Sequence, residues 1–465
     1  MSLILEKKGC YICMNQKKTS HKIDMLTGPL LGKLILFALP LAASSILQQL
    51  FNAADIAVVG RFASSRALAA VGANSSAINL MVNLFVGLSV GANVVIASLI
   101  GKGEANKINT AVHTVISVAL ASGVFLLCLG QIVAPHILTL MRTPDDVLPL
   151  AVLYLRLYFL GMPFIMLYNF GAAILRSKGD SKRPLYALTL AGVINVLLNL
   201  LLVIVCRLGV AGVAIATVIS NMVSSSMIVW LLLHEEETFR LSFFKLCVKR
   251  EHLARIIKIG APAGLQGMVF SFSNVCIQTA LNGFGSSAIA GSAAALNYEC
   301  LGYFIVSAFT QGCVTFTSQN YGAHQYERCK RIYSLSFVSA LLLNLALCGA
   351  FLLLRRPLIA VYTTEHEVAA FAIMRMALIL PFDWLMCTYE VSGGAMRGMG
   401  YSMLPAIITI FGTCVFRLAW VATVFAHVKS YIMLMAVYPA SWAVCGSAML
   451  IAYFTLRHRL FTRGA

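Results

Sequence analysis

The apolar stretch from Leu34 to Val59 constrains this chain most, because its only charged residue is Asp55. A helix that rises ~1.5 Å per residue over this stretch crosses the ~30 Å hydrocarbon core of a lipid bilayer. An ionised carboxylate inside such a helix is costly unless it faces protein or water, so Asp55 is a candidate site for an ion or a proton. The alternative is an aspartate that only hydrogen-bonds a neighbouring helix or lies at the level of the lipid headgroups.

Apolar runs of this kind fill the chain. Hydrophobic residues make up 60% and charged residues 11% of the sequence, whereas a soluble domain has roughly a quarter of its residues charged. The runs predict an all-α membrane protein with twelve transmembrane helices. The predicted spans are residues 33–60, 68–100, 109–131, 150–174, 185–206, 211–233, 253–283, 290–319, 332–354, 371–395, 403–426 and 431–455.

The net charge of +18 comes from basic residues that cluster in particular segments of the chain. Most lysines and arginines lie in the tail, residues 1–27, and in alternate connections such as residues 176–183 and 240–258. An excess of this kind marks cytoplasmic segments, so we expect a multi-pass protein of the cell membrane with both termini in the cytoplasm. Since topology accounts for the charge, nucleic acid is not expected as a partner.

The two halves of the chain repeat each other. One set of residues recurs 222 positions later: Pro40, Asn52, Phe62, Ser64, Ser65 and Pro135 as Pro262, Asn274, Phe284, Ser286, Ser287 and Pro357. A second set recurs after 221 positions: Gly91, Gly101, Lys107, Arg176, Gly179 and Pro184 as Gly312, Gly322, Arg328, Arg397, Gly400 and Pro405. The repeat predicts two six-helix lobes, residues 28–233 and 253–465, joined by a cytoplasmic linker, residues 234–252. Because six is even, both lobes enter the membrane in the same direction.

Two parallel six-helix lobes are typical of transporters that alternate access to a cleft between them. An ion channel would normally need a symmetric ring of such units, and a membrane enzyme would need a convergent catalytic set. The sequence contains no HExxH motif and no phosphate-binding GxxxxGK[ST] motif. We therefore expect a transporter with no catalytic residues and no cofactor. A membrane-embedded acyl or glycosyl transferase is an alternative.

Polar side chains on two other predicted helices reach the depth of Asp55. Asn195 and Asn199 are four residues apart and share one helix face, and Thr217 lies at a matching depth in the next helix. Together these residues offer one carboxylate and several neutral oxygens, which suit a monovalent cation such as Na⁺. The carboxylate could equally exchange protons, and the alternative role for the two amides is polar packing between helices.

Several motifs are similar to those of the multidrug and toxic compound extrusion (MATE) transporters. They are the stretch from Pro40 through Asn52-Ala-Ala-Asp55 to Val59-Gly60-Arg61-Phe62, then Gly87-Leu-Ser-Val-Gly91-Ala-Asn-Val, Gly101-Lys-Gly, Arg176-Ser-Lys-Gly179-Asp and Arg397-Gly-Met-Gly400. The resemblance covers about residues 28 to 455. It implies a V-shaped pair of six-helix lobes that exports amphipathic, often cationic organic compounds in exchange for H⁺ or Na⁺.

The resemblance also implies a cation site. The family's acid on helix 1, its two polar residues on helix 5 and its threonine on helix 6 map onto Asp55, Asn195, Asn199 and Thr217. Some branches carry aspartate at the position of Asn199, so the neutral residue here leaves both H⁺ and Na⁺ open as coupling ions. A lipid-linked oligosaccharide flippase of the same superfamily, the multidrug/oligosaccharidyl-lipid/polysaccharide flippases, is the alternative function.

The second lobe has no acid at the position that matches Asp55, because residue 277 is isoleucine. Arg417 stands where Asn195 stands in the first lobe. An ion pair between Asp383 and Arg417 is one interpretation, because buried charges require partners. The other interpretation is that these groups line the cleft and meet the substrate. The charged residues within or next to the spans of this lobe are Glu299, Asp383, Glu390 and Arg417.

Three further residues are candidates for roles in transport. Glu390 lies nearer the cytoplasmic end of its helix and could attract a cationic substrate. Some family branches place a glutamate on helix 7, where the nearest candidates here are Gln266 and Phe270. Pro40 could act as a hinge of its helix or could be a static kink. Because no span needs a partner chain, we expect a monomer that contacts the bilayer and small amphipathic substrates.

Overall fold

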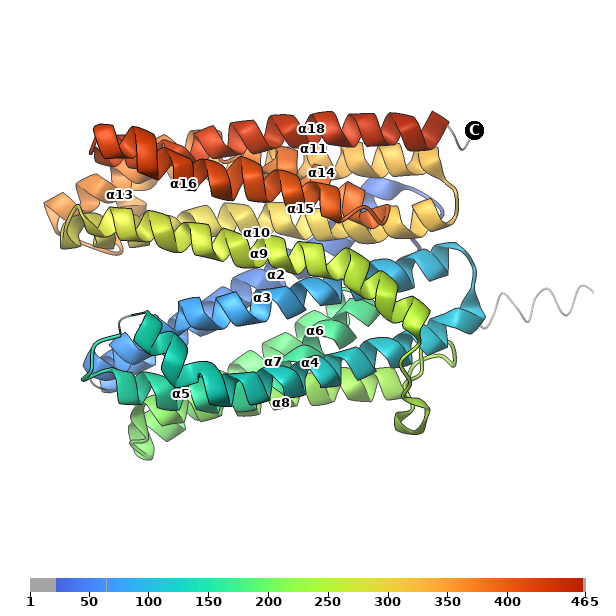
Figure 1. Cartoon of the computed structure of the whole chain (residues 1–465), viewed down its shortest axis with the longest axis horizontal. Coiled ribbons are helices and arrows are strands. Elements are labelled where there is room, and N and C mark those ends of the chain that lie inside the picture. The colour runs from blue at the N-terminus through green and yellow to red at the C-terminus, as the bar shows by residue number, and fades with distance from the viewer. Residues whose placement is uncertain (1–21, 64, 142, 463–465) are drawn as a thin grey trace, which may run out of the picture.

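The structure, a computed structural model, describes residues 22–462 except 64 and 142. The described residues form helices and connections without a β-strand (Figure 1). The helices of the first half are α2 (Leu30–Phe62), α3 (Ser65–Gly101), α4 (Ala105–Leu140), α5 (Leu148–Leu160), α6 (Met162–Ser177), α7 (Lys182–Asn199), the π-helical stretch η2 (Leu200–Val205) and α8 (Gly209–Leu233). The short 3₁₀-helix η3 (Phe243–Lys245) lies in the linker.

The second half has the same overall order of helices. It contains α9 (Arg250–Asn282), α10 (Ser286–Gly322), α11 (Tyr326–Leu353), α12 (Arg355–Ala360), α13 (His366–Ile379), η4 (Leu380–Phe382), α14 (Leu385–Gly398), α15 (Met403–Thr409), η5 (Ile410–Val415), α16 (Phe416–Trp420), η6 (Val421–Phe425), α17 (Tyr431–Met435) and α18 (Val437–Thr462). The stretches η5 and η6 are π-helical, like η2 in the first half.

Among the described residues, nine helices are long and apolar enough to cross a membrane, and two bent pairs raise the number to eleven. The pairs are α5 with α6, bent by 46°, and His366–Phe382 with α14, bent by 49°. Pro163 follows the first bend and Pro381 lies at the second. Proline interrupts a helix because it lacks an N–H group and clashes with the preceding turn. The remaining expected span, 253–283, coincides except for its last residue with part of α9, which is 33 residues long.

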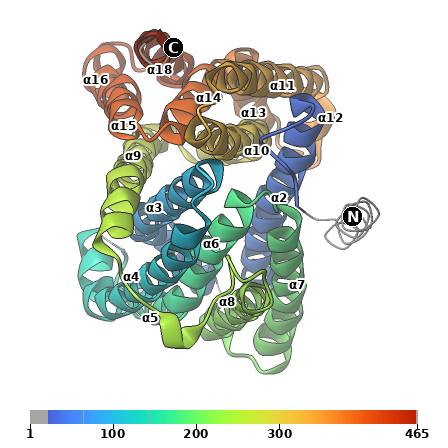
Figure 2. The same ribbon diagram turned by 90° about the vertical axis from the view of Figure 1, so that its right-hand side faces the viewer.

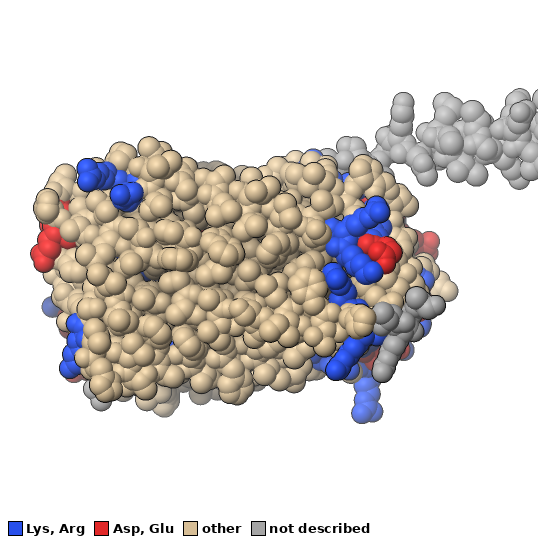
Figure 3. All heavy atoms as spheres, turned by 90° about the horizontal axis from the view of Figure 1, so that it is seen from above, with Lys and Arg blue, Asp and Glu red and all other residues tan. Residues whose placement is uncertain are grey.

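The surface is that of a multi-pass membrane protein. Figure 3 shows a broad belt free of lysine, arginine, aspartate and glutamate between two charged ends of the molecule. Large apolar side chains such as Leu197, Leu342 and Ile451 are exposed on the helices. Blue side chains gather at the right-hand end in Figure 3, which is also the end that holds the C-terminus in Figure 1. This end, with the connections at 102–104 and 178–181, is called the basic end below.

The helices gather in two bundles, with α3 to α8 in one and α9 to α18 in the other (Figures 1 and 2). The helix α2 belongs to both. Leu34 and Phe37 in its first half are buried in the core of the second lobe, and the ring centroids of Phe37 and Phe316 are 5.7 Å apart. In the second half of α2, Phe51 and Asp55 contact α7. The sequence assigned all of this helix to the first lobe, because hydropathy does not reveal which neighbour a helix contacts.

The two lobes meet most closely along α3 and α9. A β-carbon on Gly87 would lie 2.2 Å from the backbone nitrogen of Gly264 in α9. At the end of α3, a β-carbon on Gly101 would lie 1.9 Å from the carbonyl oxygen of Gln319 in α10. The backbones therefore touch where only glycine fits. Asn83 Nδ2 also donates a hydrogen bond of 3.0 Å to Ser271 Oγ across the interface. The close contacts extend from the middle of α3 to its basic end.

A short segment before α2 crosses the basic end from one lobe to the other. The N–H of Ile23 donates to the carbonyl of Gly179 at 3.2 Å in the first lobe. In the second lobe, the Arg328 guanidinium donates to the carbonyls of Thr27 at 2.8 Å and Gly28 at 3.0 Å. Gly179 has a φ of +97°, a conformation that favours glycine. The segment thus joins the lobes at this end.

The linker is fastened to the first lobe by a buried carboxylate. Glu235 contacts Lys178, and its Oε1 lies 2.5 Å from Nη2 of Arg183. Burial alone raises the pKa of Glu235, but the two basic partners outweigh it and hold the pKa below its ordinary value. The carboxylate therefore stays ionised at neutral pH, and the connection 178–183 keeps its place against the linker.

Candidate functional site

The polar residues predicted around Asp55 come together in the first lobe. Asp55 lies half-buried on α2, and Asn195 and Asn199 are buried one turn apart on α7. Asn199 Nδ2 donates to Asp55 Oδ1 and also to Asn195 Oδ1, the latter at 3.2 Å. The i, i+4 spacing puts both amides on one face of α7. The π-helical stretch η2 begins directly after Asn199, and such irregular turns are frequent at functional sites.

Asp55 faces a cavity of about 320 Å³ that extends between the lobes. Thr217 from α8 lines the same cavity, but its hydroxyl donates to the carbonyl of Val213 at 3.0 Å. The wall next to the second lobe includes Gln311 of α10. The sequence did not indicate the tyrosines in this wall, Tyr154 and Tyr158, because aromatic residues in apolar runs give no signal that separates lining from packing.

The donor set around Asp55 fits a proton or a monovalent cation. Asp55 is the one acidic residue among those that line the cavity in the described structure. The buried Oδ1 of Asn199 has no hydrogen-bond partner among the described residues, so an acceptor remains next to the carboxylate. No group of three or more His, Cys, Asp or Glu side chains that could hold a metal occurs in the described part of the chain.

The charged residues of the second lobe pair differently from the sequence-based interpretation. Arg375 binds Glu299 through two hydrogen bonds, Nε to Oε1 at 2.7 Å and Nη2 to Oε2 at 2.9 Å. Asp383 instead accepts hydrogen bonds from Asn344 at 2.9 Å and from the Cys348 thiol at 3.5 Å. Arg375 was not predicted as a site residue, although a charge inside the apolar span 371–395 signals a buried partner.

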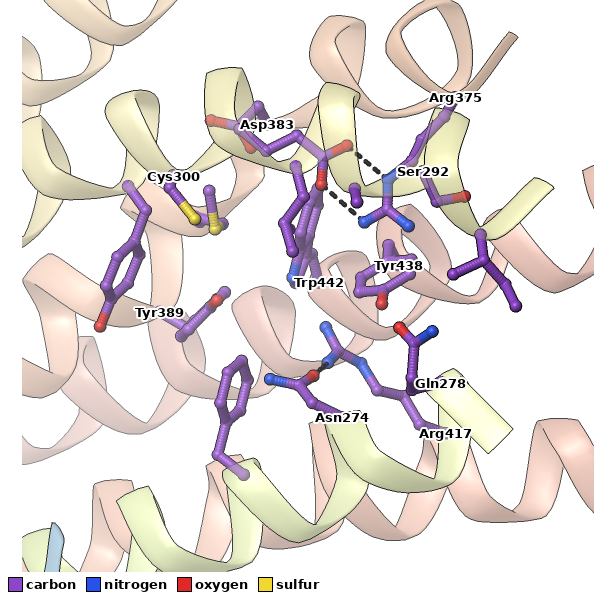
Figure 4. A pocket seen from close by; sticks show the side chains of 17 residues that line it. Asn274, Gln278, Ser292, Cys300, Arg375, Asp383, Tyr389, Arg417, Tyr438 and Trp442 are labelled. Atoms are coloured by element: carbon purple, nitrogen blue, oxygen red, sulfur yellow. Dashed lines mark hydrogen bonds and ion pairs between the residues drawn. The ribbon is translucent and has the colours of Figure 1, made fainter. Parts of the chain in front are cut away.

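The predicted ion pair between Asp383 and Arg417 is not among the ion pairs of the described residues. The Arg417 side chain donates from Nε to Ser441 Oγ at 3.0 Å and from Nη1 to Asn274 Oδ1 at 3.1 Å. Figure 4 shows Arg417 beside Asn274, with Arg375 a separate group. Both Arg417 and Asp383 line one pocket of this lobe. The other interpretation, that these groups line the cleft and meet the substrate, stays a prediction.

The remaining candidates lie on α2, α9 and α14. Gln266 Oε1 accepts a hydrogen bond of 2.7 Å from Arg397 Nη2, and Glu390 is half-buried on α14. Pro40 lies inside the continuous helix α2, where its carbonyl accepts a hydrogen bond of 2.8 Å from Ser44 Oγ. The roles proposed for Glu390, Gln266 and Pro40 stay predictions.

One run in α3 has the spacing of a hydrolase motif without its structure. Gly87-Leu-Ser-Val-Gly91 matches the pattern GxSxG, which in hydrolases puts the serine on a sharp turn between a strand and a helix. Here the run lies inside a helix, and Ser89 Oγ donates to the carbonyl of Val86 at 2.7 Å. The two glycines instead permit the contact with α9.

The comparison with protein families now decides the family. The model of the family MatE matches residues 40–201 and again residues 262–422, so it covers both repeats. The chain belongs to the MATE family. A probable multidrug resistance protein of Bacillus subtilis, YoeA, is 28% identical to this MATE protein over 427 residues, 88% of this chain and 90% of the relative. The probable multidrug resistance protein NorM of Thermotoga maritima is 24% identical, over 83% of this chain and 84% of the relative.

Solved structures share the fold of this MATE protein. A MOP superfamily transporter from Pyrococcus furiosus superposes with a TM-score of 0.88 at 23% identity, covering 96% of this chain and 99% of that one. An outward-facing multidrug resistance MATE transporter of the same superfamily gives a TM-score of 0.87 at 22% identity, with the same coverage. This MATE protein is therefore a membrane transporter by family, and its two lobes have the fold of these structures. The flippase alternative is not favoured.

Proposed function

We propose that this MATE protein is an antiporter of the cell membrane that exports amphipathic, cationic organic compounds in exchange for H⁺ or Na⁺, with Asp55 as the coupling group. The observation that carries the proposal is a carboxylate within an apolar helix, hydrogen-bonded to Asn199 and open to a cavity between the lobes. A group at this depth that only stabilised packing would not need to face a cavity. The names of the relatives support export of drugs.

The coupling follows from competition for one cavity. A cation or proton that binds at Asp55 favours the conformation in which it binds best, and the organic compound favours the conformation in which its own site is complete. Gln311 of α10, in the second lobe, lines the same cavity. Binding of a proton or a cation at Asp55 therefore changes the charge of a cavity that both lobes line. Pro40 lies fifteen residues before Asp55 in the same helix, and its missing N–H makes this part of α2 easier to bend.

We place the basic end in the cytoplasm, because lysine and arginine mark cytoplasmic loops. With this orientation the close contact of α3 with α9 shuts the cytoplasmic side. The conformation is then one that releases substrate to the outside. The cycle requires α3 and α9 to separate when the protein loads from the cytoplasm and to return to contact for release.

Gly87→Ala is expected to impair this cycle. The new methyl group would lie 2.2 Å from the Gly264 backbone nitrogen, and overpacking of this kind costs ~1–3 kcal/mol. The equilibrium constant between the closed contact and the separated state should therefore fall by roughly 5- to 150-fold, and efflux should slow. Gly72→Ala is the matched control on the same helix, because nothing lies within 4 Å of the position that its new β-carbon would take. Equal efflux by both variants would contradict a role for this contact.

The proposed function is tested with purified protein in proteoliposomes loaded with a fluorescent lipophilic cation. Proton and sodium gradients are imposed separately, and dye movement is recorded against protein-free vesicles. Movement that follows one gradient supports the antiport and identifies the ion. If neither gradient drives movement of the dye, exchange of an organic cation for H⁺ or Na⁺ is rejected.

A further inference from the structure

The second lobe contains a pocket of about 300 Å³ that the proposed coupling at Asp55 does not use. It lies among α9, α10, α13, α14, α16 and α18, and Figure 4 shows the side chains that surround it. Asn274 and Gln278 on α9 line it and are themselves exposed, so the pocket is open along this face. A volume of this size accommodates a small organic compound.

Arg417 is a buried charge in this pocket with unused donors. Only 1% of the residue is exposed. Its hydrogen bonds go to the neutral oxygens of Ser441 and Asn274, and no carboxylate among the described residues forms an ion pair with it. Its Nη2 atom is buried and has no partner among the described residues. An unpaired buried guanidinium is costly, and an anionic ligand would remove that cost.

The two acids that line the pocket are engaged by other groups. Arg375 holds both oxygens of Glu299, and Asn344 and Cys348 hold one oxygen of Asp383, although its other oxygen has no donor among the described residues. The Tyr438 ring lies between the two arginines, with its centroid 5.3 Å from Cζ of Arg375 and 4.7 Å from Cζ of Arg417. The ring separates the neutralised arginine from the unpaired one.

A second buried donor and a set of aromatic rings complete the surroundings of Arg417. Trp442 lines the pocket, and its buried indole nitrogen has no acceptor among the described residues. The Phe270 ring centroid lies 5.2 Å from Cζ of Arg417. Arginine and indole N–H groups suit a carboxylate or a phosphate, and the rings suit an aromatic body.

The repeat of the chain relates Arg417 to a residue of the site around Asp55. Arg417 lies 222 positions after Asn195, and residue 277, which follows Asp55 by the same interval, is isoleucine. The second lobe thus has no carboxylate at the position that matches Asp55, and it has the guanidinium of Arg417 at the position that matches the amide of Asn195. Arg417 also lies on α16, the short helix between the π-helical stretches η5 and η6, as Asn199 lies directly before η2.

We propose that this pocket binds the carboxylate or phosphate group of an aromatic organic compound through Arg417. The guanidinium forms paired hydrogen bonds to the anionic group, Trp442 donates a further one, and the aromatic body packs against Phe270 and Tyr438. Such a ligand differs from the cationic compounds proposed for the cavity at Asp55. The binding site needs no ion gradient, so it stands or fails separately from the proposed antiport.

The test is equilibrium dialysis of the purified full chain in detergent micelles, with protein-free micelles subtracted. The three probes share one ring system: naphthalene carboxylate, naphthyl phosphate and the neutral naphthalene carboxamide. We expect saturable binding of at least one anion, about tenfold or more tighter than the carboxamide, as a charge-assisted hydrogen bond implies. The anion that binds more tightly identifies the preferred group. This comparison uses the wild-type protein, so it does not depend on the folding of a variant.

Variants assign the binding to Arg417. Arg417→Gln should weaken binding of the preferred anion by about tenfold or more, and Trp442→Phe should weaken it less because the ring is kept. Lys429→Gln removes an exposed positive charge elsewhere in this lobe and should leave binding unchanged. Absence of saturable anion binding, equal affinity for the carboxamide, or full affinity in Arg417→Gln would each overturn the proposal.

Discussion

Asp55→Asn should reduce gradient-driven efflux to the rate seen without a gradient. Asparagine has nearly the same shape and can still accept the hydrogen bond from Asn199, but it cannot carry a proton or a negative charge at neutral pH. Since no other acidic residue lines this cavity in the described structure, nothing in the cavity can take over the coupling. The measurement is dye movement in proteoliposomes under whichever gradient drives the wild type.

The stability of the Asp55→Asn variant separates a coupling role from a packing role. A charged group in an apolar surrounding costs more than a neutral amide of the same size, so the thermal midpoint of the variant should equal or exceed that of the wild type. Asp145→Asn is the matched control, because it makes the same chemical change at an exposed position. A variant with normal coupling but lower stability would show that Asp55 stabilises the packing of helices through its hydrogen bond and does not couple transport to the ion.

Much of the first-lobe site could be predicted because helix geometry fixes it. The four-residue spacing of Asn195 and Asn199 determines that both face one way, and the distance of each residue from a helix end gives its depth. Depth in the membrane and helix face together were enough to predict that these amides lie close to Asp55. Thr217 reached the same cavity, but its hydroxyl turned to its own helix, which spacing alone does not decide.

In the second lobe the need of buried charges for partners was not enough to identify the partners. The pairing of Asp383 with Arg417 was inferred because both charges lie within apolar spans, yet this says nothing about their positions around the bundle axis. The bend at Pro381 changes the direction of the chain just before Asp383, and the π-helical stretches on both sides of Arg417 alter the turn on which its side chain lies. Neither effect has a periodic signal in the sequence, so the actual partners of these two charges could not be inferred from it.

The buried pair of Arg375 and Glu299 is expected to have the largest effect on stability. In Glu299→Gln, the Arg375 guanidinium keeps its charge but loses the two hydrogen bonds to a carboxylate, at 2.7 and 2.9 Å. Removing one partner of a buried ion pair typically costs about 3–5 kcal/mol. We therefore expect a clear decrease in the thermal unfolding midpoint of the purified protein in detergent, larger than that of Glu104→Gln. Glu104 is the matched control because its partner, Lys107, is exposed.

A double variant distinguishes the unpaired charge from lost packing. In Glu299→Gln combined with Arg375→Met, neither member of the pair carries a charge, and replacing a buried ion pair with apolar groups is often neutral or stabilising. The double variant should recover most of the stability lost by Glu299→Gln alone. If its loss of stability instead equals the sum of the losses of the two single variants, the pair stabilises the lobe through packing.

Anion binding gives a second measurement on Glu299→Gln. This variant leaves a second unpaired guanidinium, that of Arg375, beside Tyr438. If the pocket recognises negative charge, the variant should bind the aromatic anion more tightly than the wild type.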